Sequence, residues 1–388
     1  MFGALLFVIY LAFISLGLPD SLLGSAWPII RRQISVPLSY SGIVFMIISV
    51  GTVISSLNSD RLIRRFGTGK VTAASTLTTV LALFGFSISN SFISLCLCAV
   101  PYGLGAGSID AALNNYVALH YESRHMSWLH CMWGIGAATG PLLMSLALSN
   151  FNDWHLGYRY VGIIQALLTV ILFISLPLWK KDKEEENEES KAQQKKSFRE
   201  VIRISGVIEM MLAFFCYCAL EQTTGLWASS WLVEVKDIDA TTAARFAALF
   251  YTGITIGRAI SGFITFRLND SQMVRLGQGI IAAGLFMLVQ NFSGALSLFG
   301  LILIGLGCAP IYPSMIHSVP GRFRVENSQA IVGIQMASAY IGTSLMPPLF
   351  GWLTRYSDLK ILPLYLIIIL VIMIIAHEKL TGGKSNDS

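Results

Sequence analysis

Apolar residues dominate twelve stretches of the chain, and short polar segments separate these stretches. Most of the stretches exceed the ~18 apolar residues that a membrane-spanning helix needs. A backbone in lipid must satisfy its own hydrogen bonds, so these stretches predict helices and not strands. The predicted spans cover roughly residues 3–26, 38–59, 69–89, 93–117, 127–149, 158–179, 206–233, 243–267, 273–291, 295–317, 328–353 and 361–377.

Polar residues, glycines and prolines recur at an offset of about 200 residues. Four pairs of segments match in chain order: Asp20-Ser-Leu-Leu-Gly24 with Glu221-Gln-Thr-Thr-Gly225, Gly51…Ser55…Arg61 with Gly257…Ser261…Arg267, Gly103-Leu-Gly105 with Gly305-Leu-Gly307, and Pro141 with Pro347. Four matches in one register predict two homologous halves. Secondary transporters are commonly built this way, with a substrate site near the membrane midplane between the halves.

One long polar segment, from Lys180 to Arg199, separates the sixth span from the seventh. Its mixed charges and scarcity of apolar residues are typical of a solvated linker. The sequence therefore predicts an N-terminal six-helix half (1–180), a cytoplasmic linker (181–205) and a C-terminal six-helix half with a short cytoplasmic tail (206–388). The predicted fold is an all-α membrane protein with twelve transmembrane helices in two halves that a pseudo-twofold repeat relates.

The distribution of basic residues predicts the orientation in the membrane. Most of the 27 lysines and arginines fall in the loops and the linker that share a side with both chain ends. The positive-inside rule places that side in the cytoplasm. The net charge of +5 is thereby explained without a nucleic-acid partner. We expect a monomer in the bacterial inner (cell) membrane.

Neither a cleaved leader nor a metal centre is expected. Met1 is followed almost directly by the first apolar stretch, without a basic segment or a convincing cleavage site, so this stretch is interpreted as a retained helix. All cysteines lie within predicted spans, where apolar packing explains them best: Cys96, Cys98, Cys131, Cys216, Cys218 and Cys308. No disulfide framework and no cofactor is expected.

Three carboxyl groups inside predicted spans are candidates for proton coupling, because an ionised acid in lipid is costly: Asp20, Asp110 and Glu221. Asp110 shares one helix face with Gly103, Gly107 and Asn114, and small residues on that face permit a close neighbouring helix. Gly17, Gly24 and Trp27 form a similar stripe around Asp20. A desolvated carboxyl takes up a proton more readily and can release it during transport. The alternative is a polar clasp between helices, with each acid permanently protonated.

Other polar side chains in the spans are candidates for hydrogen bonds to a polar solute, with aromatic rings beside it. They are Asn114, Asn115, His130, Trp133, Gln222, Trp227, Tyr312 and Gln335. A single histidine is more often a packing residue than a proton relay, so His130 has both interpretations. Arg258 stands nine residues before Arg267, about 14 Å of helix, which is too deep for easy contact with water. We expect it to pair with a membrane carboxylate or with backbone carbonyls.

The segment Asp60-Arg61-Leu-Ile-Arg64-Arg65-Phe-Gly67 follows the second span. Together with twelve spans in two halves and a charged central loop, it resembles the major facilitator superfamily. In that superfamily such residues are thought to lock the cytoplasmic ends of the halves, which implies a cytoplasmic gate made of Asp60, Arg61, Arg64 and Arg65. The match is partial, because Ser56 and Ile63 stand where glycine is usual.

Within that superfamily the chain is most similar to the fucose permease group of sugar–proton symporters. The segments that carry the similarity are Asp20, Gly105-Ala-Gly-Ser-Ile-Asp110-Ala-Ala-Leu-Asn114, Gly257-Arg258, Tyr312-Pro313-Ser314 and Gly342…Pro347. The resemblance implies proton coupling and sugar binding for Asp20 and Asp110. The chain departs from the group in having Asp110 in place of glutamate and Asn114-Asn115 in place of Asn-Pro, and Glu221 has no clear counterpart there.

These observations predict a proton-coupled symporter that carries a small polar solute, a monosaccharide by resemblance, through alternating access. Two alternatives stay open: a proton-driven exporter of lipophilic compounds, and a Na⁺-coupled symporter, since carboxylates and amides ligate a hard cation. A membrane enzyme or receptor is disfavoured. The spans hold no nucleophile–base pair, and the longest polar stretch is a linker of about 25 residues.

Overall fold

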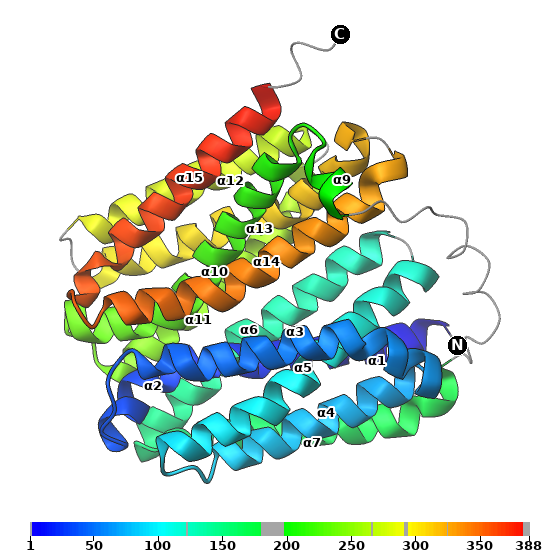
Figure 1. The fold of residues 1–388 in the computed structure, drawn as a ribbon. Helices are drawn as coiled ribbons and strands as arrows, with labels where there is room; N and C mark the ends of the chain where they lie inside the picture. Colours follow the sequence, from blue (N-terminus) through cyan, green and yellow to red (C-terminus); the bar gives the residue numbers. More distant parts are fainter. Residues whose placement is uncertain are drawn as a thin grey trace. The chain divides into compact units, whose positions relative to one another are not determined.

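The computed structural model describes residues 2–121, 123–179, 198–264, 267–290, 294–323 and 325–382. Every regular element in these ranges is a helix, and the long helices run in bundles (Figure 1). The prediction of an all-α protein with a helix for each apolar stretch is therefore confirmed. Residues 180–197, which hold most of the predicted linker, lie outside the described residues.

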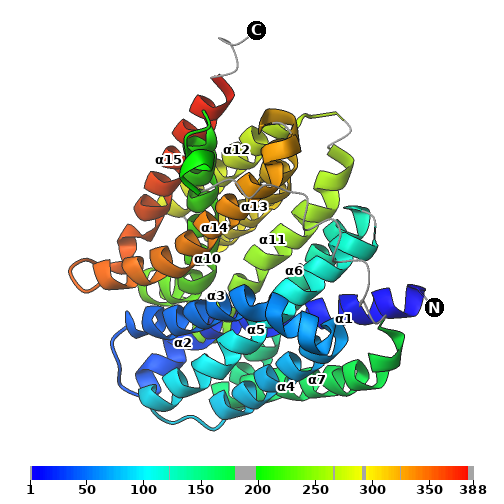
Figure 2. The same cartoon turned by 45° about the vertical axis from the view of Figure 1, so that its right-hand side comes forward.

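The chain clusters into two compact units. The first contains residues 1–192 together with 237–248. Its α-helices are α1 (Phe2–Asp20), α2 (Leu22–Gln33), α3 (Tyr40–Phe66), α4 (Thr68–Phe86), α5 (Phe92–His120), α6 (Ser123–Phe151) and α7 (Trp154–Ser175). A 3₁₀ turn, η1 (Leu176–Leu178), follows α7. Helix α4 lies beside α5 and α7 in both views (Figures 1 and 2).

The second unit contains residues 193–236 and 249–388. Its helices are α9 (Phe198–Ile202), α10 (Val207–Lys236), α11 (Ala240–Ile264), α12 (Asp270–Val289), α13 (Gly294–Phe323), α14 (Val325–Leu353), η2 (Leu359–Ile361) and α15 (Leu362–Gly382). Helix α15 runs beside α10 and α12 (Figure 2). The first residues of α11 cluster with the first unit, where Arg245 Nε donates to Ser145 Oγ at 3.0 Å.

The helices differ from the predicted spans mainly at their ends. The predicted spans 38–59 and 295–317 continue to Phe66 and Phe323, because a helix does not stop where its apolar residues stop. The first predicted span, 3–26, is interrupted near its C-terminal end, since α1 ends at Asp20 and α2 begins at Leu22. Pro19 explains the break: it has no N–H for the carbonyl of Ser15, four residues earlier.

Nine spans in the described part of the chain are long and apolar enough to cross a membrane. They do not include α10, α11 or α14, which are described helices of 30, 25 and 29 residues. Each of these three carries a polar candidate: Glu221, Arg258 and Gln335 respectively. These candidates contribute to the lower hydropathy of the three helices, together with other polar residues such as Glu209 on α10 and Arg245 on α11.

Glycines hold the helices of the first unit at backbone contact, and the second unit repeats the same contacts. A Cβ added to Gly51 on α3 would lie 3.2 Å from Leu104 N on α5, and one on Gly257 would lie 3.0 Å from Leu306 O on α13. Leu104 and Leu306 are 202 residues apart, which is the offset between the glycine pairs beside them. Small residues permit this closeness in membranes. The repeat is therefore present in the packing as well as in the sequence.

A second pair of corresponding helix contacts shows how Asp20 and Glu221 align between the two units. A Cβ on Gly136 of α6 would collide with the carbonyl oxygen of Ile14 on α1. A Cβ on Gly342 of α14 would lie 2.5 Å from the carbonyl oxygen of Phe215 on α10. Ile14 and Phe215 are 201 residues apart, as are Asp20 and Glu221. These two acids therefore occupy corresponding positions in the two units.

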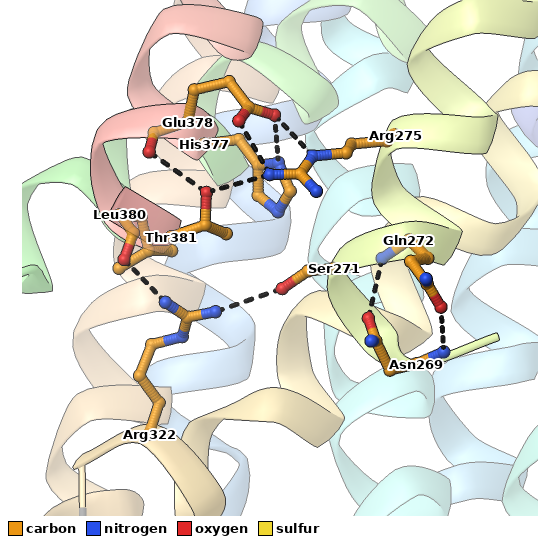
Figure 3. Close-up of polar contacts among 9 residues, drawn as sticks. All are labelled: Asn269, Ser271, Gln272, Arg275, Arg322, His377, Glu378, Leu380 and Thr381. Carbon is orange, nitrogen blue, oxygen red and sulfur yellow. Dashed lines mark hydrogen bonds and ion pairs between the residues drawn. The ribbon is translucent and has the colours of Figure 1, made fainter. Parts of the chain in front are cut away.

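Polar contacts tie together the ends of α12, α13 and α15 (Figure 3). The Arg275 guanidinium donates to both oxygens of Glu378, at 2.7 and 2.8 Å, and both side chains are about half exposed. The half-buried Arg322 donates to the Leu380 carbonyl at 2.6 Å and to Ser271 Oγ at 3.2 Å. Burial lowers the pKa of the Arg322 guanidinium, and the nearby charge of Asp270 opposes that shift.

These two arginines should differ in their contribution to stability. We expect Arg322→Ala to destabilise the second unit by about 1–3 kcal/mol, because it leaves two partly buried acceptors without their donor. Arg275→Ala should destabilise the protein less than Arg322→Ala does, since exposed ion pairs contribute little. Thermal unfolding of both variants in detergent checks the order, and a larger loss for Arg275→Ala would contradict it.

Candidate functional site

The break between α1 and α2 positions Asp20 in the middle of a membrane-spanning segment. Asp20 is the last residue of α1, and the segment extends from Gly3 to Gln33. The hydroxyl of Ser21, the single residue between the helices, donates to the carbonyl oxygen of Ala137 on α6 at 2.8 Å. The break is therefore attached to α6, and the Asp20 side chain is open to solvent.

Three glycines bring α6 against this break. A Cβ on Gly17 would collide with the carbonyl oxygen of Trp133, and one on Gly140 would collide with that of Leu18. Gly136, which lies on α6 one turn before Gly140, contacts the Ile14 carbonyl on α1, as described above. The predicted Gly17 stripe on the first helix thus has a partner stripe on α6, and the close approach places the Trp133 indole beside Asp20.

Each oxygen of the Asp20 carboxyl accepts one hydrogen bond from a neutral donor on another helix. Tyr102 on α5 donates its hydroxyl to Oδ1 at 2.8 Å, and Trp133 on α6 donates its indole N–H to Oδ2 at 2.8 Å. The Tyr102 side chain is 4% exposed, whereas Asp20 is open. Two donors fix the plane of the carboxyl, and neither of them neutralises its charge.

Asp110 lies on α5 within electrostatic range of Asp20. Its Oδ1 accepts a hydrogen bond from Asn114 Nδ2 at 2.9 Å, one helical turn further on. On the same face, Cβ atoms on Gly103 and Gly107 would collide with the carbonyl oxygens of Ile48 and Thr52 on α3. The predicted glycine stripe therefore brings α3 close, as the sequence indicated, and Asp110 is half-buried rather than sealed.

The corresponding acid of the second unit, Glu221, lies in a more closed environment. Its side chain is 7% exposed and accepts a hydrogen bond from the Tyr217 hydroxyl on the same helix. Tyr217 and Cys308 are within electrostatic range of both Glu221 and Arg258. A carboxylate partner for Arg258 stays a prediction, and these shared neighbours support it.

Other predicted residues of the second unit contact the protein itself. Trp227 donates its indole N–H to the Pro347 carbonyl at 3.0 Å, and Tyr312 donates to Met336 Sδ at 3.7 Å. Gln335 is completely buried, and neither end of its amide has a hydrogen-bond partner among the residues that the structure describes. Gln222 is half-buried beside Glu221 on α10. Their roles in binding a solute stay predictions.

The remaining predicted residues of the first unit are dispersed. Asn115 on α5 is exposed, and the His130 ring packs edge-on against Phe13 with ring centroids 5.8 Å apart. Of the predicted cytoplasmic gate, Arg61 and Arg65 are exposed, and Arg65 lies over the ring of its neighbour Phe66. The side chains of the two other predicted gate residues, Asp60 and Arg64, lie outside the described residues.

Tyr102 is the residue of this site that sequence reasoning missed. It precedes the Gly103 stripe inside an apolar stretch, and a buried tyrosine hydroxyl needs a hydrogen-bond partner. The need for such a partner was the signal in the sequence that could have identified Tyr102 as a site residue. Its partner Asp20 lies 82 residues away in the chain, on a helix that no local pattern connects to α5.

Comparison with known proteins gives one family. The model of the Major Facilitator Superfamily matches residues 9–316. The chain is 21% identical to the glucose/mannose transporter GlcP of Bacillus subtilis, over 97% of this chain and 95% of that protein. It is 22% identical to the sodium-dependent glucose transporter 1 of Homo sapiens, over 90% of this chain and 74% of that protein.

Solved structures show the same fold. The nucleoside transporter NupG aligns with a TM-score of 0.77 at 13% identity, over 97% of this chain and 98% of that one. A bacterial homolog of the human lysosomal transporter Spinster, in an inward-facing state, aligns with a TM-score of 0.73 at 13% identity, over 98% of both chains. These alignments confirm the predicted twelve-helix architecture with two halves.

Proposed function

Since the chain belongs to the major facilitator superfamily, we propose that it is a proton-coupled symporter of a monosaccharide, acting by alternating access. One observation supports the site most directly: Asp20 is solvent-accessible in the middle of a membrane-spanning segment. An ionised carboxyl facing lipid is very costly, so the opening at Asp20 is assigned to an aqueous path through the protein.

The side chains around Asp20 suit a sugar. Carboxylates and amides accept and donate hydrogen bonds to hydroxyl groups, and an aromatic ring packs against the apolar face of a pyranose. Asp20, Asp110, Asn114 and the Trp133 ring supply these groups within the first unit. Two relatives named as glucose transporters and the motifs similar to the fucose permease group support the choice of a hexose.

Coupling follows from linkage between the proton and the sugar. In this proposal the Asp20–Asp110 pair, whose carboxyls lie within electrostatic range, holds one proton in the form that binds the sugar. If the sugar binds better to the singly protonated pair, its binding raises the affinity for the proton by the same factor. An inward proton gradient then drives accumulation of the sugar.

Sodium coupling is the second candidate. The human relative is named a sodium-dependent glucose transporter, and a carboxylate pair with amide oxygens offers the hard ligands that Na⁺ takes. We favour the proton because the recorded partners of the Asp20 carboxyl are hydrogen-bond donors, which occupy the oxygens that a cation would need.

Uptake by purified protein in proteoliposomes tests the proposal. Glucose, mannose and fucose are supplied under an inward proton gradient, an inward Na⁺ gradient, or neither. We expect one of these hexoses to accumulate under the proton gradient, and a protonophore should abolish the accumulation. Accumulation under the Na⁺ gradient alone would establish the second candidate. Efflux of lipophilic cations without any hexose uptake would establish an exporter.

The orientation and assembly belong to the same proposal. We place both chain ends in the cytoplasm of a bacterial cell and the protein in its inner membrane as a monomer, on the distribution of basic residues. Cysteine-specific labelling of whole cells at the two chain ends checks the orientation. Reaction with a membrane-impermeant reagent added outside would reverse it.

A further inference from the structure

We infer that Trp133 and Tyr102 are positioning residues that keep Asp20 ionised and thereby assign the transported proton to Asp110. This inference rests on the proposed function and specifies it further. The two carboxyls then have different roles. Asp20 is a fixed anion that orients the solute, and Asp110 is the group that binds and releases the proton.

The indole of Trp133 favours the ionised form of Asp20. An indole N–H can only donate, and it is directed at Oδ2 over 2.8 Å. A hydrogen bond to a carboxylate is stronger than one to a neutral carboxyl, so protonation of Asp20 would weaken this contact.

Tyr102 favours the ionised form of Asp20 in the same way. Its hydroxyl donates to Oδ1 at 2.8 Å, from a side chain that is 4% exposed. Each oxygen of Asp20 therefore accepts a hydrogen bond that is stronger to a carboxylate than to a neutral carboxyl.

Among the described residues, a single side chain donates to the Asp110 carboxyl. It is the Asn114 amide, and the same nitrogen also donates to the Asp110 carbonyl oxygen at 3.0 Å. Asp110 thus has one hydrogen bond that favours its ionised form where Asp20 has two. When the pair holds one proton, we assign that proton to Asp110.

The second unit shows that these donors are not required by the fold. The position that corresponds to Tyr102 at the offset of 202 is Ile304, and the position that corresponds to Trp133 at the offset of 206 is Ala339. Neither side chain can donate a hydrogen bond. Glu221 is bound instead by Tyr217 of its own helix. The pair of cross-helix donors is therefore specific to Asp20.

The surroundings of Asp20 limit what else could titrate with it. Helix α5 supplies Tyr102 and Asp110. Helix α6 supplies Trp133, which does not titrate, and the titratable His130, whose ring packs against Phe13 on α1. Helices α2 and α7 supply no recorded charged partner of Asp20 among the described residues. A change in the pH dependence of transport after mutation of Trp133 or Tyr102 can therefore be assigned to the Asp20–Asp110 pair.

The test is the pH profile of hexose uptake in proteoliposomes at fixed proton-motive force. The acidic limb reports protonation of Asp20, and the alkaline limb reports loss of the proton from Asp110. We expect Trp133→Phe to move the acidic limb upward by about one pH unit, since one hydrogen bond to the carboxylate is lost, and to leave the alkaline limb in place. Tyr102→Phe should move the same limb in the same direction.

Two matched controls should leave both limbs unchanged. Trp128→Phe makes the same substitution at an exposed position of α6. Tyr158→Phe removes a hydroxyl from a buried tyrosine that packs on Phe86, as Tyr102 does. If Trp133→Phe does not fold, the acidic limb of Tyr102→Phe is measured in its place. Wild-type profiles in both folded variants, with proton-driven uptake intact, would overturn the inference and leave the proposed function standing.

Infrared difference spectroscopy of the protonated-carboxyl band gives a readout without transport. We expect this band in the wild-type protein to titrate over the alkaline limb and to disappear in Asp110→Asn. A band that persists in Asp110→Asn and disappears in Asp20→Asn would put the proton on Asp20 and overturn the assignment.

Discussion

Asp110→Asn should abolish the accumulation of hexose against its gradient while leaving exchange of hexose across the membrane intact. An amide has the shape of the protonated acid, and Asn114 can hydrogen-bond to it as it does to Asp110. The variant therefore resembles the proton-loaded carrier permanently. It can bind solute and reorient, but it has no proton to release, so the proton gradient no longer performs work.

Counterflow and driven uptake in the same proteoliposomes check this prediction. Counterflow of labelled hexose should stay within about threefold of wild type, and the accumulation ratio under a proton gradient should fall to about one. Asp237→Asn is the matched control, because it makes the same change at an exposed residue whose positive φ of 53° asparagine tolerates. Normal accumulation by Asp110→Asn would remove Asp110 from the coupling mechanism.

The sequence alone predicted which residues share a helix face and which positions of the two halves correspond. Gly103, Gly107 and Asp110 recur at helical spacing, so their common face and the close approach of a neighbouring helix follow from periodicity alone. The offset between Asp20 and Glu221 likewise predicted corresponding positions, and the packing of α6 on α1 and of α14 on α10 confirms that correspondence.

The partners of these acids could not be predicted, because they depend on which helices become neighbours. Trp133 was a candidate for binding solute, yet its indole N–H is engaged by Asp20, 113 residues earlier in the chain. Pro19 stood in the sequence as a signal for a break in the first span. An apolar run of sufficient length nevertheless favours a continuous helix, and the contact of Ser21 with α6, which accompanies the break, joins residues 116 positions apart in the chain.

Substitution of single glycines should separate the stability of the helix crossing from the chemistry of the site. We expect Gly136→Ala to destabilise the protein by about 1–3 kcal/mol, because the added methyl group meets the Ile14 carbonyl and would lie 2.9 Å from Leu18 N. The helices must then move apart, and Trp133 moves with α6 away from Asp20. The acidic limb of the uptake profile should therefore shift upward, as in Trp133→Phe.

Two further alanines make this test specific. Gly342→Ala disturbs the corresponding crossing in the second unit, where the methyl group would lie 2.5 Å from the Phe215 carbonyl oxygen. It should lower the melting temperature to a similar extent and leave the acidic limb in place, since Tyr102 and Trp133, which donate to Asp20, lie on α5 and α6. Gly279→Ala adds the same methyl group into open space on α12 and should leave stability unchanged or raise it by up to about 1 kcal/mol. A melting temperature for Gly136→Ala equal to that of Gly279→Ala would show that the α1–α6 crossing accommodates a methyl group. The placement of Trp133 against Asp20 would then need another cause than these glycines.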